Sequence, residues 1–155
     1  MKNLKDIITE RLHITKQTKA QTYNYFPETI DELRKILKER LAKDKNADLT
    51  DIDTSKITDM SYLFTGLYPS NIDISNWDVS NVENMYCMFW GCDDFNPDLS
   101  KWDVGKVKNM RYMFFDCRKF KGKGLEKWNV SKVKDMSNMF GRCTSLKNIP
   151  NWYKK

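Results

Sequence analysis

The chain has 155 residues, of which 40% are hydrophobic, 13% aromatic and 31% charged, and its net charge is +6. This composition excludes an intrinsically disordered chain, because enough apolar side chains are present to form a core. No run approaches the ~20 apolar residues of a membrane span, and residues 1–11 lack the apolar stretch of a signal peptide. We therefore expect one domain, or one with a small appendage, in the cytoplasm.

Residues 1–48 lack the repeat described below and have helical spacing of apolar residues. A first amphipathic helix is predicted around Leu4, Ile7, Ile8 and Leu12. A second is predicted from Thr29, which has capping-box spacing with Glu32, to about Lys43. We expect residues 1–48 to form a helical cap that covers the first hydrophobic layer of a repeat region. The first helix is equally compatible with a docking or targeting arm.

One pattern recurs every 24 to 26 residues in the rest of the chain, residues 49–155. The block Trp-Asp-Val-Ser-Asn-Val-Glu-Asn-Met at 77–85 returns at 102–110 and at 128–136, with a degenerate copy at 52–60. The predicted units are 50–74, 75–99, 100–125 and 126–149, with a partial unit at 150–155.

Each unit combines two local patterns. Alternating residues such as Trp102 and Val104 favour a short strand. Val107, Met110 and Cys117 have the spacing of a short helix, and Ser80 with Glu83 has capping-box spacing at its start. Because so short a unit cannot bury its apolar side chains alone, we predict an α/β solenoid of parallel short strands and short helices. Identical residues would then form buried columns: Trp77/Trp102/Trp128/Trp152, Phe64/Phe89/Phe114/Phe140 and Cys92/Cys117/Cys143.

At these residues the chain resembles the BspA-like leucine-rich-repeat family, in the branch whose repeat reads W-D-V-S-x-V-x-N-M-x-x-M-F-x-x-C. Residues 77–100 match that pattern nearly in full, and the resemblance covers roughly residues 50–153. It implies a leucine-rich-repeat-like fold and a bacterial or bacteriophage protein. The N-terminal segment resembles that of short phage and Bacteroides-type members. The family's surface-adhesion role is not carried over, since no export signal is present.

The sequence offers no catalytic, cofactor or metal site. The four cysteines include no C-x-x-C motif, and the single histidine, His13, lies far from them. We expect buried free thiols, no cofactor and no enzymatic activity.

Charge is distributed unevenly along the repeats. Residues 49–100 carry one basic and 9 acidic side chains, whereas residues 101–155 carry 15 basic and 4 acidic ones. The basic half predicts an alternative function, nucleic-acid binding, through Lys101, Lys106, Lys108, Arg111, Arg118, Lys119, Lys121, Lys123 and Lys127.

Two sets of residues are candidates for partner binding. The first set flanks the tryptophan position and would form two ladders on the exposed strand face: Asp51, Asn76, Lys101, Lys127, and Asp53, Asp78, Asp103, Asn129. The Asp/Asn ladder has a local alternative, hydrogen bonding to nearby backbone amides. The second set is aromatic: Tyr62, Tyr86 and Tyr112, taken as one repeat position replaced by Asn138 in the last unit, with Trp90 and Phe115. Packing at the edge of the core is the alternative for these.

The favoured function is a non-catalytic protein–protein interaction module that binds through the exposed strand face and the charge-polarised surface. A phage-encoded host-interaction or virion-associated protein falls within this class. The last segment, residues 150–155, ends in a strand pattern, so self-association through that strand edge is a further expectation.

Overall fold

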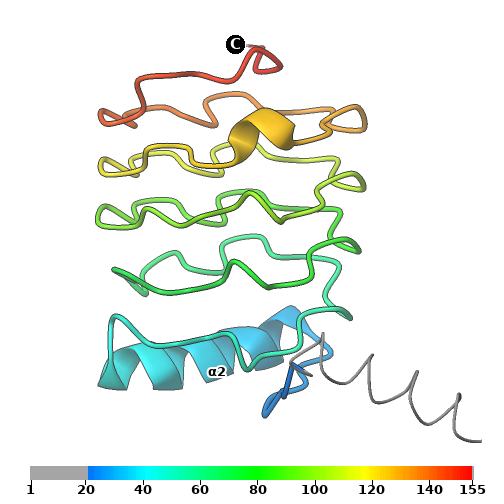
Figure 1. The fold of residues 1–155 in the computed structure, drawn as a ribbon, viewed down its shortest axis with the longest axis vertical. Helices are drawn as coiled ribbons and strands as arrows, with labels where there is room; N and C mark the ends of the chain where they lie inside the picture. Colours follow the sequence, from blue (N-terminus) through cyan, green and yellow to red (C-terminus); the bar gives the residue numbers. More distant parts are fainter. Residues whose placement is uncertain (1–20, 155) are drawn as a thin grey trace, which may run out of the picture.

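The computed structural model describes residues 21–154. In this part of the chain it contains one α-helix, α2 (Ile30–Lys43), and one short 3-10 helix, η1 (Leu125–Lys127), with no β-strand. The remaining described residues form turns and extended links (Figure 1). The first predicted helix and His13 lie outside the described residues. The division at residue 48/49 stays a prediction.

The predicted solenoid of parallel strands and short helices is wrong. Neighbouring segments share only isolated parallel bridges, and those of Asn84 with Asp59 and with Asn109 lie where helices, not strands, were expected. Where helices were expected, the chain forms successive turns closed by bonds from residue i to residue i−3, as from Met113 N–H to the Met110 carbonyl. Apolar residues three apart fit such turns as well as they fit a helix, which explains the error.

The second predicted helix is confirmed as α2. Thr29 accepts a hydrogen bond from the Glu32 N–H at 3.3 Å, and the Glu32 carboxylate accepts one from the Glu28 N–H at 2.8 Å. The first bond satisfies a backbone donor that the first helical turn leaves unpaired, and the second ties Glu28, which precedes the N-cap residue, to that turn. Leu33, Leu37 and Leu41 lie on one side of the helix and are fully buried. The helix therefore packs its apolar side onto the loops that follow.

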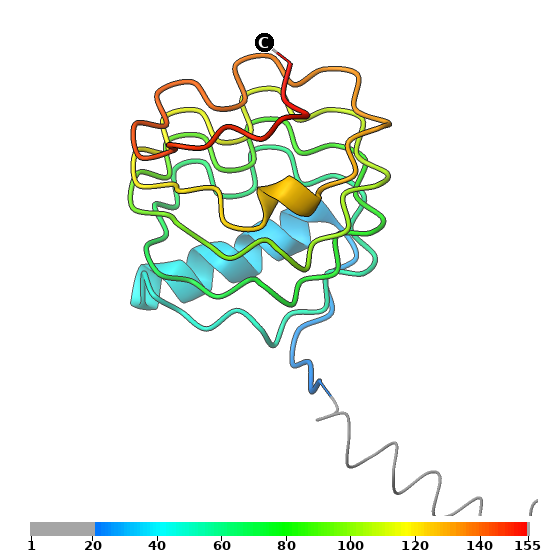
Figure 2. The same ribbon diagram turned by 45° about the horizontal axis from the view of Figure 1, so that its top comes forward.

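After α2 the chain runs in loops of about one sequence unit that lie one above another (Figures 1 and 2). We call them layers 1 to 4: residues 50–74, 75–99, 100–125 and 126–149. Residues 150–154 lie over layer 4, and α2 lies at the opposite end of the stack (Figure 1).

Along one side, backbone hydrogen bonds join successive layers. Met85, Cys87 and Phe89 donate their N–H groups to the carbonyls of Asn109, Arg111 and Met113, and the same register joins layer 3 to layer 4. Every second N–H on this side is therefore used between layers. In an α-helix each of these N–H groups would bond to a carbonyl of the same helix, so these segments cannot be helical.

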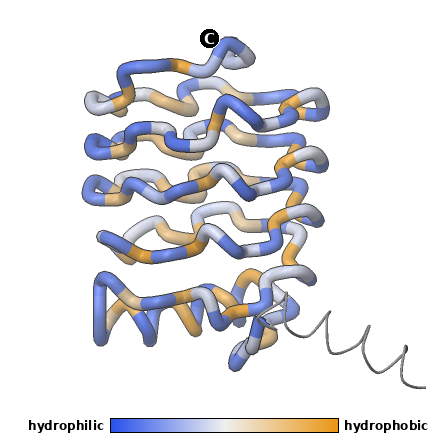
Figure 3. The backbone as a smooth tube through the Cα atoms, viewed as in Figure 1, coloured by the Kyte–Doolittle hydropathy of each residue, from blue (hydrophilic) through white to orange (hydrophobic). Residues whose placement is uncertain are grey.

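The recurring apolar side chains fill the space inside the layers. Phe64, Phe89, Phe114 and Phe140 stack on one another, with ring centroids 5.2 to 5.8 Å apart. Hydrophobic and hydrophilic residues alternate along each layer (Figure 3), because alternate side chains face inward and outward. The core is one continuous cluster from α2 to Cys143.

Buried polar groups in this core bond to the layer beneath. The indole N–H groups of Trp77, Trp102, Trp128 and Trp152 donate to the carbonyls of Leu49, Ile74, Leu99 and Leu125 at 2.8 to 3.2 Å. The thiols of Cys92, Cys117 and Cys143 lie against the carbonyls of Phe64, Phe89 and Phe114. The recurrence of Trp and Cys therefore supplies hydrogen bonds as well as apolar area.

Candidate interaction surface

The Asp/Asn ladder is occupied by local hydrogen bonds. One side-chain oxygen each of Asp53, Asp78, Asp103 and Asn129 accepts the backbone N–H two residues further on, at 2.9 to 3.1 Å. Asp48, Asp73 and Asp98 make the same bond at another corner of the layers. These side chains close turns, so the structure gives the ladder a role in folding.

The other predicted ladder is mixed. Asp51 forms an ion pair with Arg40 of α2 at 3.3 Å. Asn76 donates to the Thr50 carbonyl at 3.0 Å, and its side-chain oxygen is buried without a partner among the described residues. Lys101 and Lys127 are exposed. The strand-face candidates thus share a position in the layers without forming one charged surface.

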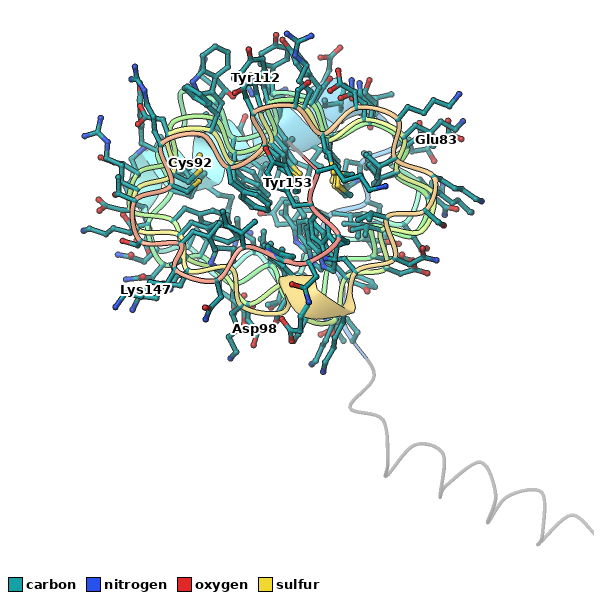
Figure 4. All side chains as sticks on the ribbon, turned by 90° about the horizontal axis from the view of Figure 1, so that it is seen from above. Glu83, Cys92, Asp98, Tyr112, Lys147 and Tyr153 are labelled. Atoms are coloured by element: carbon teal, nitrogen blue, oxygen red, sulfur yellow. The ribbon has the colours of Figure 1, made fainter. Side chains whose placement is uncertain are left out.

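The aromatic candidates lie together in one surface cluster. The Tyr62 and Tyr86 rings meet edge to face at 5.1 Å, and Tyr112 lies 6.4 Å from Tyr86. The Trp90 ring stacks on Tyr112 at 6.0 Å and meets Phe115 at 6.0 Å. We call these five residues the aromatic cluster. Figure 4 shows Tyr112 and Asp98 on opposite sides of the layers.

The repeat register assigned to Tyr86 was wrong. Tyr62, Cys87, Tyr112 and Asn138 are equivalent, since all four follow the recurrent Met by two residues and share φ values of 51° to 56°. Tyr86 comes one residue earlier, at the position of Ser61, Arg111 and Ser137. The three tyrosines therefore come from two adjacent positions of layers 1 to 3, and Trp90 and Phe115 share a third position.

The fold does not require aromatic residues at these positions. Trp90 and Phe115 are replaced by Thr65 in layer 1 and by Gly141 in layer 4, and Tyr112 is replaced by Asn138. All layers make the same turn there, as shown by the bond from residue i to residue i−3 at each of the four positions. Yet Tyr62 is 43% exposed and Trp90 is 40% exposed. Large apolar side chains kept at the surface without a packing requirement are typical of a binding site.

A hollow of about 300 Å³ lies beside the cluster, between Tyr62, Tyr68 and Trp90, with Thr65, Gly66 and Gly91 completing its wall. Tyr68, which the sequence pattern did not single out, is 65% exposed. The neighbouring backbone is held from α2, because the Arg34 guanidinium donates to the carbonyls of Leu63 and Thr65 at 2.8 and 2.7 Å as well as to that of Tyr62. The backbone beside the hollow is therefore held in place by hydrogen bonds from α2.

Two arginines border the cluster on its other side. The Arg111 guanidinium lies 5.0 Å from the Tyr112 ring centroid, and that of Arg142 lies 5.7 Å from the Phe115 centroid. Arg111 also approaches Asp135 at 3.9 Å. Arg142 has no acidic partner in residues 21–154. This combination of Tyr, Trp and Arg is the one enriched at interface hot spots.

Residues 32–152 match the family described as "Mycoplasma protein of unknown function, DUF285". The chain belongs to the DUF285 family. All four layers and the aromatic cluster lie within the matched range. No curated protein and no solved structure matches the chain.

Part of the basic charge of this DUF285 chain, in layer 3, is neutralised by the layer beneath. Lys108, Lys119 and Lys123 of layer 3 pair with Glu83, Asp94 and Asp98 of layer 2, the last at 2.6 Å. Arg118 pairs with Asp93 and Asp116. The acidic and basic halves seen in the sequence are thus stacked against each other, which leaves less free charge for a polyanion than the sequence suggested.

The described residues offer no metal or reactive thiol site. No group of three or more His, Cys, Asp or Glu residues within 21–154 is arranged to hold a metal ion. All four cysteines are free and buried, as expected. Burial raises the pKa of Cys92 to about 12 and that of Cys143 to about 11, so these thiols stay protonated at neutral pH. No helix within residues 21–154 is long and apolar enough to span a membrane.

Proposed function

We propose that the chain is a non-catalytic protein-binding module whose contact surface is the aromatic cluster. The observation that carries the proposal is the presence of exposed Trp and Tyr at positions where other layers have Thr, Gly or Asn. Aromatic side chains bury a large area on binding with few rotatable bonds, so they contribute strongly to protein interfaces. The Asp/Asn ladder is less suited to this role, because its oxygens close turns.

The proposal includes membership of the BspA-like branch and a phage or bacterial origin. Both are supported by the repeat pattern in residues 77–100. Action in the cytoplasm is proposed on the sequence grounds given above. The strand edge predicted in residues 150–155 is not observed, because residues 150–154 form no strand, and self-association through it is not proposed. A phage-encoded or virion-associated protein remains within this class.

Nucleic-acid binding is the second candidate. It is supported by Lys106, Lys108, Lys132 and Lys134, which occupy two equivalent positions of layers 3 and 4, two residues apart. Against it, Lys108 is paired with Glu83, and Lys106 donates to Asn81 at 2.7 Å.

The test is affinity capture from lysate of the source organism, with and without nuclease treatment, using the wild type and three variants as bait. Trp90→Thr and Tyr112→Asn install residues that other layers already carry, at Thr65 and Asn138, so the fold should persist. Asp103→Asn, which copies Asn129, is the control on the other side of the layers.

We expect specific proteins to be retained by the wild type and by Asp103→Asn, and to be lost from Trp90→Thr and Tyr112→Asn. Capture of the same proteins by all forms would refute the aromatic cluster as the contact surface. Capture that disappears for every form on nuclease treatment would favour the nucleic-acid alternative.

A further inference from the structure

We propose that the hollow between Tyr62, Tyr68 and Trp90 binds an extended proline-rich segment of a protein partner, which continues across Phe115 so that an acidic side chain meets Arg142. This inference rests on the proposed function and names the class of ligand that the same surface takes.

The hollow is kept open by two glycines. Gly66 and Gly91 have φ values of 77° and 70°, and a Cβ added to either would meet no atom within 4 Å. The left-handed backbone alone does not demand glycine here, because the equivalent residues of layers 3 and 4 are Asp116 and Arg142, with φ values of 60° and 59°. Layers 1 and 2 thus lack a side chain that the turn itself would accommodate.

Trp90 offers a hydrogen-bond donor beside the hollow. The other four indole N–H groups of the chain each donate to a backbone carbonyl. That of Trp90 has no acceptor within the part of the chain that the structure describes, and its side chain is 40% exposed. An indole N–H at an aromatic surface is suited to receive a peptide carbonyl.

A polyproline II segment matches these features. Its carbonyls make no internal hydrogen bonds, so they are free to accept from Trp90. Its proline rings fit between aromatic walls, and such grooves select it because its conformation is already fixed. No charged side chain lines the hollow, which is appropriate for an apolar ring and unfavourable for a phosphate or a carboxylate.

The charge on the neighbouring surface sets the second feature of the ligand. Trp90 lies 6.0 Å from Phe115, and the Arg142 guanidinium lies 5.7 Å from Phe115, so the path from Trp90 to Arg142 is at most about 12 Å. A polyproline II chain rises ~3.1 Å per residue, and four residues therefore cover that distance. An acidic residue about four positions from the bound proline would pair with a guanidinium that has no acidic partner in residues 21–154.

The test uses dye-labelled peptides and fluorescence anisotropy with the full chain. Both probes carry a proline pair and a glutamate joined by a proline-rich spacer. In one probe the glutamate lies four residues after the proline pair, and in the other it lies four residues before it. Matched peptides replace all prolines by alanine, or the glutamate by lysine. A labelled ten-nucleotide oligothymidine reports on stacking of nucleic-acid bases, the competing use of an aromatic surface with nearby arginines.

We expect one of the two glutamate probes to bind and its alanine counterpart to bind at least tenfold more weakly. Trp90→Thr should weaken that probe at least tenfold, because a central aromatic contact is lost, and Gly91→Asp should do the same by placing a side chain in the hollow. Arg142→Gly, which copies Gly66 and Gly91, should weaken the glutamate probe several-fold and leave the lysine peptide unchanged. Asp103→Asn should bind as the wild type does, with circular dichroism confirming that each variant is folded.

The inference is overturned if neither probe binds, if binding is unaffected by Trp90→Thr and Gly91→Asp, or if oligothymidine binds with the same dependence on Trp90. The capture experiment separates this failure from that of the proposed function. Partner capture that still depends on Trp90, without peptide binding, leaves the function standing and removes only this ligand class. Capture independent of Trp90 removes both.

Discussion

The two sides of each layer are joined to the next layer in different ways. On the side of the aromatic cluster, backbone N–H groups bond to backbone carbonyls, as in the pair of Cys87 and Arg111. On the tryptophan side, the segments around Trp77, Trp102 and Trp128 are joined by indole N–H groups that donate to carbonyls. Backbone bonds form with almost any side chain, whereas the indole bonds need tryptophan.

This difference explains where the sequence repeats and where it varies. The tryptophan position is constant in layers 2 to 4 and in residue 152, because each indole is both core and hydrogen-bond donor. On the other side the position of Trp90 changes to Thr, Phe and Gly. A surface whose backbone is fixed independently of its side chains is free to acquire residues for binding.

The largest expected effect comes from Trp102→Ala. This change removes a buried ring and its bond to Ile74, and it should lower the free energy of unfolding by about 3–5 kcal/mol. Urea denaturation followed by circular dichroism measures the loss. Trp90→Thr is the matched change on the other side and should cost about 1 kcal/mol or less. Equal losses for the two variants would contradict the division between the sides.

A narrower change isolates the hydrogen bond. Trp102→Phe keeps an aromatic ring in the core but leaves the Ile74 carbonyl without its donor, so we expect a loss of about 1–2 kcal/mol. The same urea titration serves, with an unchanged m-value showing that the folded state is retained. If Trp102→Phe is as stable as the wild type, the indole bonds do not explain why tryptophan recurs.

The sequence alone predicted α2, the buried columns and the aromatic candidates, but not the local structure of the layers. The helix was predictable because Thr29, Glu32 and the leucines are local signals. The short helices were wrongly predicted because residues such as Val107 and Met110 have a spacing that turns share with helices. The hollow was missed because it depends on Gly66 and Gly91. Only an alignment with the equivalent residues Asp116 and Arg142 shows that the turn does not require glycine there.

The carboxylates that close turns should contribute less to the free energy of unfolding than the indoles do. Asp103→Ala removes the acceptor for the Gly105 N–H at 2.9 Å and should cost about 1 kcal/mol of unfolding free energy. Asp103→Asn should be nearly neutral, because Asn129 makes the same bond to Ser131 at 3.1 Å. A comparable loss in both variants would mean that the negative charge, and not the turn, is what position 103 supplies.

The smallest effect is electrostatic and depends on pH. Hydrogen bonding and the positive charge of Lys123, together with bonds from Ser100, hold the pKa of Asp98 below its usual value. A carboxyl whose pKa is lowered by folding stabilises the protein above its unfolded pKa of about 3.9, and this contribution is lost as the pH falls toward the folded value. Because the pair is exposed, the contribution is small.

Asp98→Asn keeps an oxygen for the turn bond to Ser100 but removes the charge that Lys123 faces. The wild type should therefore be slightly more stable than the variant at pH 6, and the difference should shrink below pH 4. Raising the salt concentration should reduce the difference at pH 6 as well, since exposed charges are screened. Equal stability of the two forms at pH 6 would show that Asp98 stabilises the layers through its turn alone, as Asp103 does, and a difference that persists unchanged at pH 2 would show that the charge is not its source.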